Sequence, residues 1–157
     1  MGKKKANNEP TIENRKARHD YHISETLECG MILEGSEVKS CREGKVSLAE
    51  GYVRVEPAPP GLYLHNVQID EYPPARGNQH TPKRVRTLLA HKRQIANLAR
   101  DTAQKGFTVV PLKMYFKDGR VKCLIGVAKG KGEYDKRQSL KTRDAAKDIR
   151  RAMTKRL

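Results

Sequence analysis

The fold is decided by one stretch of the sequence, TVVPLKMYFKDGRVKCLIGVAK, residues 108–129. Apolar and polar residues alternate on both sides of Asp118-Gly119. Alternation with a period of two is typical of a half-buried strand, and Asp-Gly between two such runs favours a two-residue turn. The sequence therefore predicts an antiparallel β-hairpin with its tip at residues 118–119.

The two-residue turn also predicts which residues of the hairpin lie opposite each other. Lys117 meets Arg120 beside the turn, and the next apolar pairs are Phe116–Val121, Met114–Cys123, Leu112–Ile125 and Val110–Val127. The other face carries Lys113, Tyr115, Lys117, Arg120 and Lys122. We expect this basic face to bind RNA, with its cations on phosphates and Tyr115 stacked on a base. A merely solvated strand face is the alternative.

The residues before the hairpin predict further strands and a helix. Residues 21–33 alternate, which predicts a strand with Tyr21, Ile23, Leu27, Cys29, Met31 and Leu33 on one face. A helix is predicted over 35–44, with Ser36 as its N-cap and Gly44 at its C-terminal end. Strands are predicted over about 45–56 and 61–70, joined by a turn at Pro59-Pro60-Gly61.

The middle of the chain predicts a loop and then a helix. Residues 72–82 are rich in turn-forming residues. Residues 84–105 have an apolar side, which predicts a helix that is kinked or divided at His91-Lys92. Together with the hairpin, these elements predict a mainly β fold, an OB-like antiparallel β-barrel with about three flanking α-helices.

We expect three segments along the chain: a flexible N-terminus over 1–13, an RNA-binding barrel domain over 14–129, and a basic C-terminal tail over 130–157. Apolar residues of the tail form one narrow helical stripe, which is Ala145, Ala146, Ile149, Ala152, Met153 and Leu157. Such a thin stripe does not hold a helix in isolation, so we expect a tail that is disordered when free and helical when bound.

Composition favours a nucleic-acid partner. The 157 residues contain 33 Lys and Arg against 18 Asp and Glu, a net charge of +15, which attracts polyanions such as RNA. No apolar run approaches the roughly 20 residues of a membrane span. Cys29, Cys41 and Cys123 are too scattered for a disulfide framework or a zinc ribbon. We expect a monomeric, cytoplasmic protein with reduced thiols.

Motifs for catalysis are weak. The segment GVAKGKG, residues 126–132, has the composition of a phosphate loop, but its spacing is one residue short and Gly132 stands where Ser or Thr would hold magnesium. The five histidines lack metal-ligand spacing, and no GxSxG sequence is present. We therefore expect no enzyme activity, no metal and no cofactor.

Several blocks resemble one known family. They are NRKARHDY (14–21), ETLECG (25–30), EGSEVKSCREGKVSL (34–48), PKRVRTLLAHKRQI (82–95) and VVPLKMYFKDGRVKCLIGVAKGKGEYDKR (109–137). In this order they resemble the SsrA-binding protein family, also called small protein B. The resemblance implies an OB-like barrel that acts as an adaptor in trans-translation. Such an adaptor binds the tRNA-like domain of transfer-messenger RNA and delivers it, with elongation factor Tu, to the A site of stalled ribosomes.

The resemblance also implies roles for single residues. Its RNA-contacting positions correspond to Glu28, Leu89 and Lys122, although Leu89 could equally belong to the core. Its ribosome-contacting positions correspond to Gly130, Tyr134, Asp135, Lys136 and Arg137, in a tail that would enter the decoding centre and sense the empty mRNA channel. The chain departs from the family's usual residues at Cys29, Cys41, Ala90 and Gly132.

Two other functions stay open at this stage. A structural ribosomal protein with an RNA-binding tail would be present on every ribosome, whereas an adaptor would be enriched on stalled ones. An RNA-processing enzyme of an unrecognised type would turn over labelled RNA.

Overall fold

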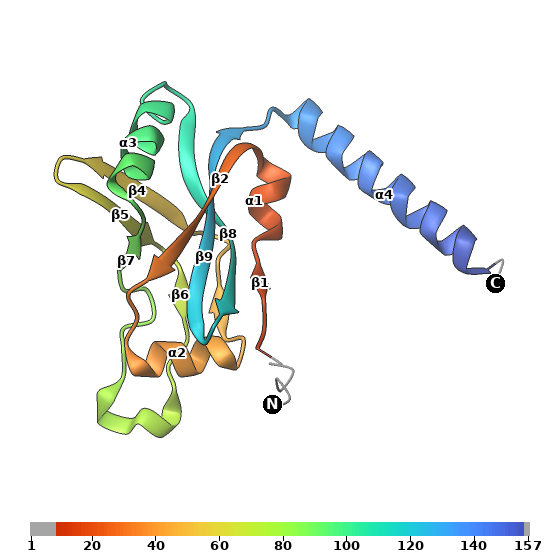
Figure 1. Cartoon of the computed structure of the whole chain (residues 1–157). Coiled ribbons are helices and arrows are strands. Elements are labelled where there is room, and N and C mark those ends of the chain that lie inside the picture. The colour runs from red at the N-terminus through yellow and green to blue at the C-terminus, as the bar shows by residue number, and fades with distance from the viewer. Residues whose placement is uncertain (1–8, 156–157) are drawn as a thin grey trace, which may run out of the picture.

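One antiparallel sheet dominates the computed structural model, which describes residues 9–155 (Figure 1). In chain order the elements are β1 (Ile12–Glu13), α1 (Arg15–Asp20), β2 (Tyr21–Met31), α2 (Gly35–Arg42), β3 (Val46–Ser47), β4 (Tyr52–Pro57), β5 (Pro60–His65), β6 (Gln68–Ile69), the 3-10 helix η1 (Pro73–Asn78), β7 (Arg86–Leu89), α3 (Lys92–Asp101), β8 (Phe107–Lys117), β9 (Arg120–Gly130) and α4 (Glu133–Lys155).

The seven-stranded sheet closes on itself. Its strand order is β1-β8-β4-β5-β7-β2-β9, and the additional pairing of β8 with β9 completes the barrel. In Figure 1, α2 lies below one end of the barrel and α3 beside the other, while α1 covers the outer side of the β8–β9 hairpin. The prediction of a mainly β, OB-like antiparallel barrel with about three flanking helices is confirmed.

The barrel interior is filled by side chains that alternate along the strands. The largest include Leu62, Leu64, Met114 and Ile125, each fully buried. Burial of one such side chain contributes about 1.5–3 kcal/mol. The three cysteines are free and buried, and burial raises the pKa of the Cys29 and Cys41 thiols to about 12.

The hairpin register follows the prediction near the turn and departs from it further on. Pairing is as predicted from Lys117–Arg120 to Met114–Cys123. The predicted pairs Leu112–Ile125 and Val110–Val127 are wrong, because a β-bulge after Pro111 shifts the register by one residue and pairs Pro111 with Ile125 and Val109 with Val127.

The bulge is held by Asn14. The Asn14 side-chain amide donates to the Pro111 carbonyl at 2.8 Å, and its backbone N–H donates to the Leu112 carbonyl at 2.8 Å. Because of the shift, Val110 and Leu112 face outward and pack with Ala17 of α1 in a second, smaller core. The sequence pattern alone could not reveal that an outer face of the hairpin is covered by a helix.

β2 contains a similar irregularity. Its register with β9 shifts between Ile23 and Thr26, next to Glu25. Leu27 and Cys29 therefore face the barrel, whereas Tyr21 and Ile23 pack in the smaller core under α1. The prediction that all the apolar residues of this strand share one face was wrong, since a bulge exchanges the two faces of a strand.

The predicted helix over 84–105 was wrong in its first part. Residues 86–89 form β7, which pairs with β5 and β2, and only α3 is helical. Its predicted end at residue 105 was also wrong, because α3 ends at Asp101 and is followed by a turn. Ser36 is also not an N-cap: Glu34 occupies that position in α2, and the Ser36 hydroxyl bonds to His80 at 2.8 Å instead.

The predicted strands over 45–56 and 61–70 each correspond to two shorter strands, β3 with β4 and β5 with β6. The predicted turn lies one residue late, because Pro57 pairs with Pro60 and the tip of this hairpin is residues 58–59. β3 and β6 pair with each other in a separate two-stranded sheet.

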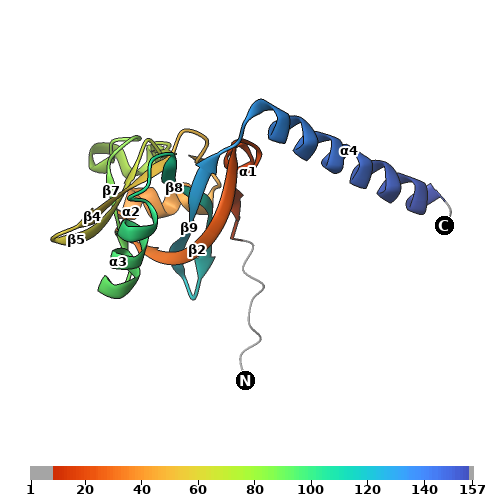
Figure 2. The same cartoon turned by 90° about the horizontal axis from the view of Figure 1, so that it is seen from above.

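The two ends of the chain differ. Residues 1–8 lie outside the described part, but Ile12–Glu13 pair with Met114 and Lys113, so the prediction of a flexible N-terminus was wrong for these two residues. At the other end, α4 projects away from the barrel in both Figure 1 and Figure 2. Its stripe residues Ile149 and Met153 are exposed, while Leu157 lies outside the described residues. That the free tail is disordered stays a prediction.

Within residues 9–155, no helix has both the length and the hydrophobicity that crossing a membrane requires. The same residues do not gather three or more His, Cys, Asp or Glu side chains into a group that could hold a metal ion.

Candidate RNA-binding surface

Four strands each place one residue in a single row on the outside of the barrel. Tyr115 of β8 pairs with Lys122 of β9, Lys122 with Gly30 of β2, and Gly30 with Leu89 of β7. A Cβ atom on Gly30 would lie 3.3 Å from the Leu89 Cβ and 3.8 Å from the Lys122 ammonium, so glycine leaves room for both side chains to meet above it. We call these four residues the cross-strand row.

Glu28 lies beside this row and is held by two donors. The Tyr115 hydroxyl donates a hydrogen bond to its carboxylate, and the Lys117 ammonium donates a second at 3.2 Å. The bond from Tyr115, followed by the one from Lys117, lowers the pKa of Glu28 below its ordinary value of 4.5. The carboxylate is therefore charged at neutral pH and is an acceptor for base or 2′-hydroxyl donors.

Tyr115 has contacts on its hydroxyl and on its ring. The Lys113 ammonium lies 5.3 Å from the ring centroid, a cation–π distance. Burial, together with the bond to Glu28, raises the pKa of Tyr115 to about 12. This phenol is therefore protonated at physiological pH, and it donates to Glu28 rather than standing free as the stacking ring that the sequence suggested.

A hollow of about 290 Å³ adjoins the row. Gly30, Leu89 and Lys122 of the row line it, and the other lining residues are Arg120, Gly119, Met31, Leu33, Val38 and Val121. Leu89 is 52% exposed, whereas its neighbour Leu88 is 2% exposed, so Leu89 is not a core residue. An exposed leucine in the same hollow as Lys122 and Arg120 is suited to contact the bases of an RNA while the two cations contact its backbone.

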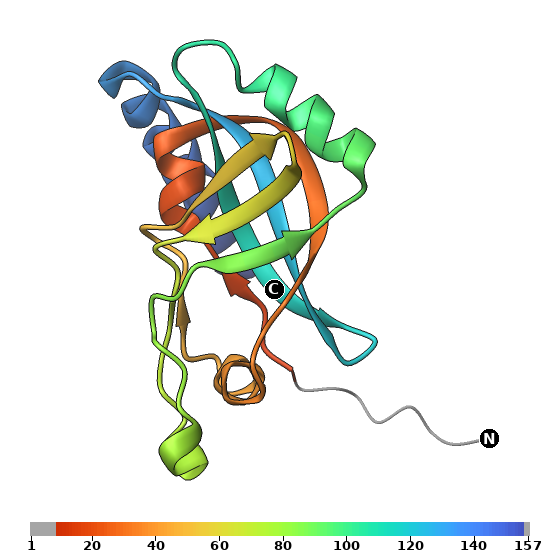
Figure 3. The same cartoon turned by 90° about the vertical axis from the view of Figure 1, so that its left-hand side faces the viewer.

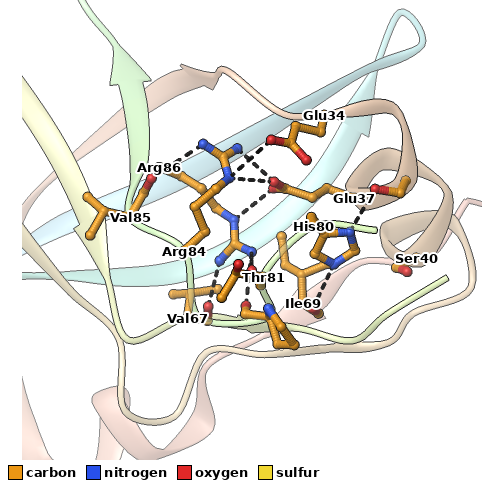
Figure 4. Close-up of polar contacts among 12 residues, drawn as sticks. Glu34, Glu37, Ser40, Val67, Ile69, His80, Thr81, Arg84, Val85 and Arg86 are labelled. Atoms are coloured by element: carbon orange, nitrogen blue, oxygen red, sulfur yellow. Dashed lines mark hydrogen bonds and ion pairs between the residues drawn. The ribbon is translucent and has the colours of Figure 1, made fainter. Parts of the chain in front are cut away.

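The start of β7 is fixed by a buried ion network that the sequence did not indicate (Figure 4). The Glu37 carboxylate of α2 accepts from Arg86 at 2.7 Å and from Arg84 at 2.8 Å, and Glu37 and Arg86 are both fully buried. Arg86 also donates to the Val67 carbonyl at 2.6 Å and to the Pro82 carbonyl at 2.9 Å.

His80 closes this network on its other side. It bridges the Ser36 hydroxyl at 2.8 Å and the Ile69 carbonyl at 2.9 Å (Figure 4). His80 therefore links α2 to β6, and the Glu37–Arg86 pair links α2 to the first residue of β7. Arg86 is three residues before Leu89. Because each buried polar group here has a partner, the network can set the position of β7.

The two predicted groups of site residues occupy different places. Glu28, Leu89, Lys113, Tyr115, Lys117, Arg120 and Lys122 come together on the outer face of four neighbouring strands. The second group, Gly130, Tyr134, Asp135, Lys136 and Arg137, begins at the last residue of β9 and continues into the start of α4. Of its side chains the structure describes Arg137, which is exposed.

β9 separates the two groups. Eight residues run from Lys122 to Gly130, which at strand spacing is about 26 Å. At the junction, the Lys131 backbone N–H donates to the Asp20 carbonyl at 2.8 Å and its ammonium to the Arg18 carbonyl at 3.2 Å. α4 therefore leaves the barrel next to α1, at the end of β9 remote from the cross-strand row.

A closed antiparallel barrel with a cationic outer face and a basic helical extension defines a small protein equipped to bind a polyanion. Residues 11–155 match the family model described as SmpB protein. Among curated proteins, the chain is 50% identical over 141 residues to an SsrA-binding protein of Halalkalibacterium halodurans, covering 90% of both chains. It is 49% identical over 144 residues to an SsrA-binding protein of Listeria welshimeri, covering 92% of both.

A third relative and a solved structure give the same result. An SsrA-binding protein of Bifidobacterium adolescentis is 48% identical over 150 residues, which is 96% of this chain and 94% of that one. A solved chain described as "tmRNA-SmpB: a journey to the center of the bacterial ribosome" superposes with a TM-score of 0.67 at 43% identity, covering 83% of this chain and 94% of that one. The chain belongs to the SmpB protein family.

Proposed function

We propose that this protein is an RNA-binding adaptor of ribosome rescue by trans-translation. It binds the tRNA-like domain of transfer-messenger RNA and delivers it to the A site of stalled ribosomes. Its relatives carry the name SsrA-binding protein, and the solved neighbour is described with tmRNA and the bacterial ribosome. The observation that carries the proposal is the cross-strand row with Glu28 beside it, because it joins Leu89 and Lys122 from distant parts of the chain on one accessible face.

The two groups of site residues divide the work. The barrel domain, residues 14–129, binds the RNA through Glu28, Leu89 and Lys122, with Lys113, Lys117 and Arg120 adding phosphate contacts and Tyr115 holding Glu28. The tail, residues 130–157, contacts the decoding centre and the mRNA channel through Gly130, Tyr134, Asp135, Lys136 and Arg137. The position of α4, at the far end of β9 from the row, supports this division.

The protein acts as a monomeric, cytoplasmic adaptor rather than as an enzyme. Elongation factor Tu reaches it through the shared RNA. Binding combines long-range attraction by a net charge of +15 with shape-dependent contacts at the row.

A gel-shift titration with the tRNA-like domain tests the proposal. Elongator tRNA and a plain RNA duplex serve as controls at low and near-physiological salt. We expect the tRNA-like domain to bind most tightly and to keep its lead as salt rises. If all three RNAs bind with equal affinity and weaken equally as salt rises, binding is non-specific attraction to phosphates. That result would favour a structural ribosomal protein.

A further inference from the structure

Aromatic residues gather on the outer face of β4 and β5. Tyr52 and Arg54 alternate with buried Val53 along β4, and Tyr63 and His65 alternate with buried leucines along β5. The register places Tyr52 opposite His65 and Arg54 opposite Tyr63. We call Tyr52, Arg54, Tyr63 and His65 the aromatic face.

Two rings of this face are stacked, and one of them is exposed. The Tyr52 and His65 ring centroids are 5.0 Å apart with an angle of 7° between the rings, and Tyr52 is 41% exposed. A Cβ atom on Gly61 would lie 2.8 Å from the Tyr63 hydroxyl, so the Tyr63 ring lies against the sheet over the space that glycine leaves.

The aromatic face is continuous with the cross-strand row. Tyr63 pairs with Thr87 of β7, and Leu89 follows two residues later on the same side of that strand. Val85 and Ile32, at the edge of these strands, are 46% and 51% exposed. Figure 3 shows β4, β5 and β7 side by side across the front of the barrel, with no helix of the described chain lying over them.

The chemistry of this face favours bases over phosphates. Arg54 is paired with Glu56 at 2.7 Å, so the face has little net charge of its own. Rings presented on a sheet bind unpaired bases by stacking, which tolerates different sequences. The alternative is that Tyr52 and His65 only stabilise the sheet as a cross-strand pair. That role would explain their contact, but it would not explain why exposed apolar side chains continue from them to Leu89.

An exposed apolar surface can also bind protein. RNA is favoured here because the chain carries a net charge of +15 and because the face adjoins Leu89 and Lys122. We propose that the aromatic face stacks on unpaired bases of the tRNA-like domain of transfer-messenger RNA, and so extends the RNA-binding surface over β4 and β5. This inference rests on the proposed function.

Three variants of the full chain test it: Tyr52→Leu removes a ring, Tyr52→Phe keeps it, and Tyr72→Leu removes a ring on the loop beside α2. The ligand is the tRNA-like domain. Losing one stacking ring should weaken binding by about 5- to 150-fold. We expect this loss for Tyr52→Leu alone, with the salt dependence of binding unchanged because no phosphate contact is lost.

Thermal melts show whether each variant is folded, and Tyr52→Trp provides a second measurement. The chain has no tryptophan, so this residue would be the only indole. A base stacked on it should quench its fluorescence with the same midpoint as binding, whereas the indole of Tyr72→Trp should not respond.

The outcomes separate the two proposals. If the unmodified chain does not prefer the tRNA-like domain to duplex RNA, the proposed function fails. If it does prefer that domain, but Tyr52→Leu binds as tightly as the unmodified chain and the indole at position 52 is not quenched, the aromatic face is not an RNA contact. Unchanged RNA binding with impaired tagging would assign the face to a protein or ribosomal partner, and would also overturn the inference.

Discussion

The Tyr115 hydroxyl donates a hydrogen bond to the Glu28 carboxylate, joining β8 to β2 across the intervening strand β9. The two residues are 87 positions apart in sequence. Together with the bond from Lys117, this bond orients the carboxylate on the outer face of β2. Tyr115 is thus a positioning residue for Glu28 in the proposed RNA contact.

Removing this hydroxyl should weaken RNA binding. Tyr115→Phe keeps the ring under Lys113 and removes only the donor, so we expect the affinity for the tRNA-like domain to fall about 2- to 10-fold. Glu28→Gln should also weaken binding, and the double variant should bind about as well as the weaker single one. Losses that multiply in the double variant would show that Tyr115 acts independently of Glu28.

The same bond predicts a pH effect. Because the pKa of Glu28 is lowered in the folded protein, its contribution to stability is present above the pKa of the unfolded chain and is lost as pH falls through the lower folded value. An NMR titration of Glu28 should therefore give a higher pKa in Tyr115→Phe than in the unmodified protein. The direction follows from the loss of the largest stabilising contact of the charged form. An unchanged pKa would mean that the bond does not persist in solution.

Lys122 should contribute a phosphate contact. We expect Lys122→Ala to weaken RNA binding. The slope of log K against log salt concentration, which measures the salt dependence, should become smaller in magnitude by about one. Lys141→Ala, on the exposed side of α4, is a matched control that should leave binding of the isolated tRNA-like domain unchanged. A salt slope equal to that of the unmodified protein would mean that Lys122 does not neutralise a phosphate.

Truncation after Lys129 should separate the two functions. The barrel keeps all strands up to that residue, so RNA affinity should stay close to that of the full chain, whereas tagging on stalled ribosomes should be abolished. Gel shifts and a reconstituted tagging reaction measure the two effects. A large loss of RNA affinity would show that the tail belongs to the RNA site as well.

Glu37 should be essential for stability. Glu37→Gln leaves Arg86 buried without a charged partner, and breaking a buried pair in this way costs about 3–5 kcal/mol. Glu34→Gln is the matched control, because Glu34 is half exposed and 3.9 Å from Arg84. Urea unfolding measures both free energies, and similar values for the two variants would contradict the role given to the network.

The sequence predicted the parts of this fold that depend on local patterns. The hairpin turn at Asp118-Gly119 and the pairs beside it follow from residue alternation and turn chemistry. The bulge at Leu112 could not be predicted, because it depends on Asn14, which is 97 residues from Pro111. Residues 84–91 were given to a helix because a short apolar run has no period that separates strand from helix. There, pairing with two neighbouring strands and the bond from Arg86 to Glu37 decide the structure.

The candidate site was predictable to a similar extent. The basic side of the hairpin could be deduced from alternation alone, while Glu28 and Leu89 came from the family resemblance. The role of Gly30 could not be deduced, since it depends on which strands lie on either side of β2. The aromatic face was missed because its residues are two pairs on neighbouring strands, and neither strand has an unusual composition by itself.

β9 has one further consequence. It is hydrogen-bonded to β2 on one edge and to β8 on the other along most of its length, so it cannot stretch or bend independently. The distance from Lys122 to the end of β9 is therefore fixed by the barrel. An RNA bound at the row would be held at a constant distance from the point where the tail departs. Because Lys131 is hydrogen-bonded to α1, only Gly132 lies between that anchored residue and the start of α4 to set the direction of the tail.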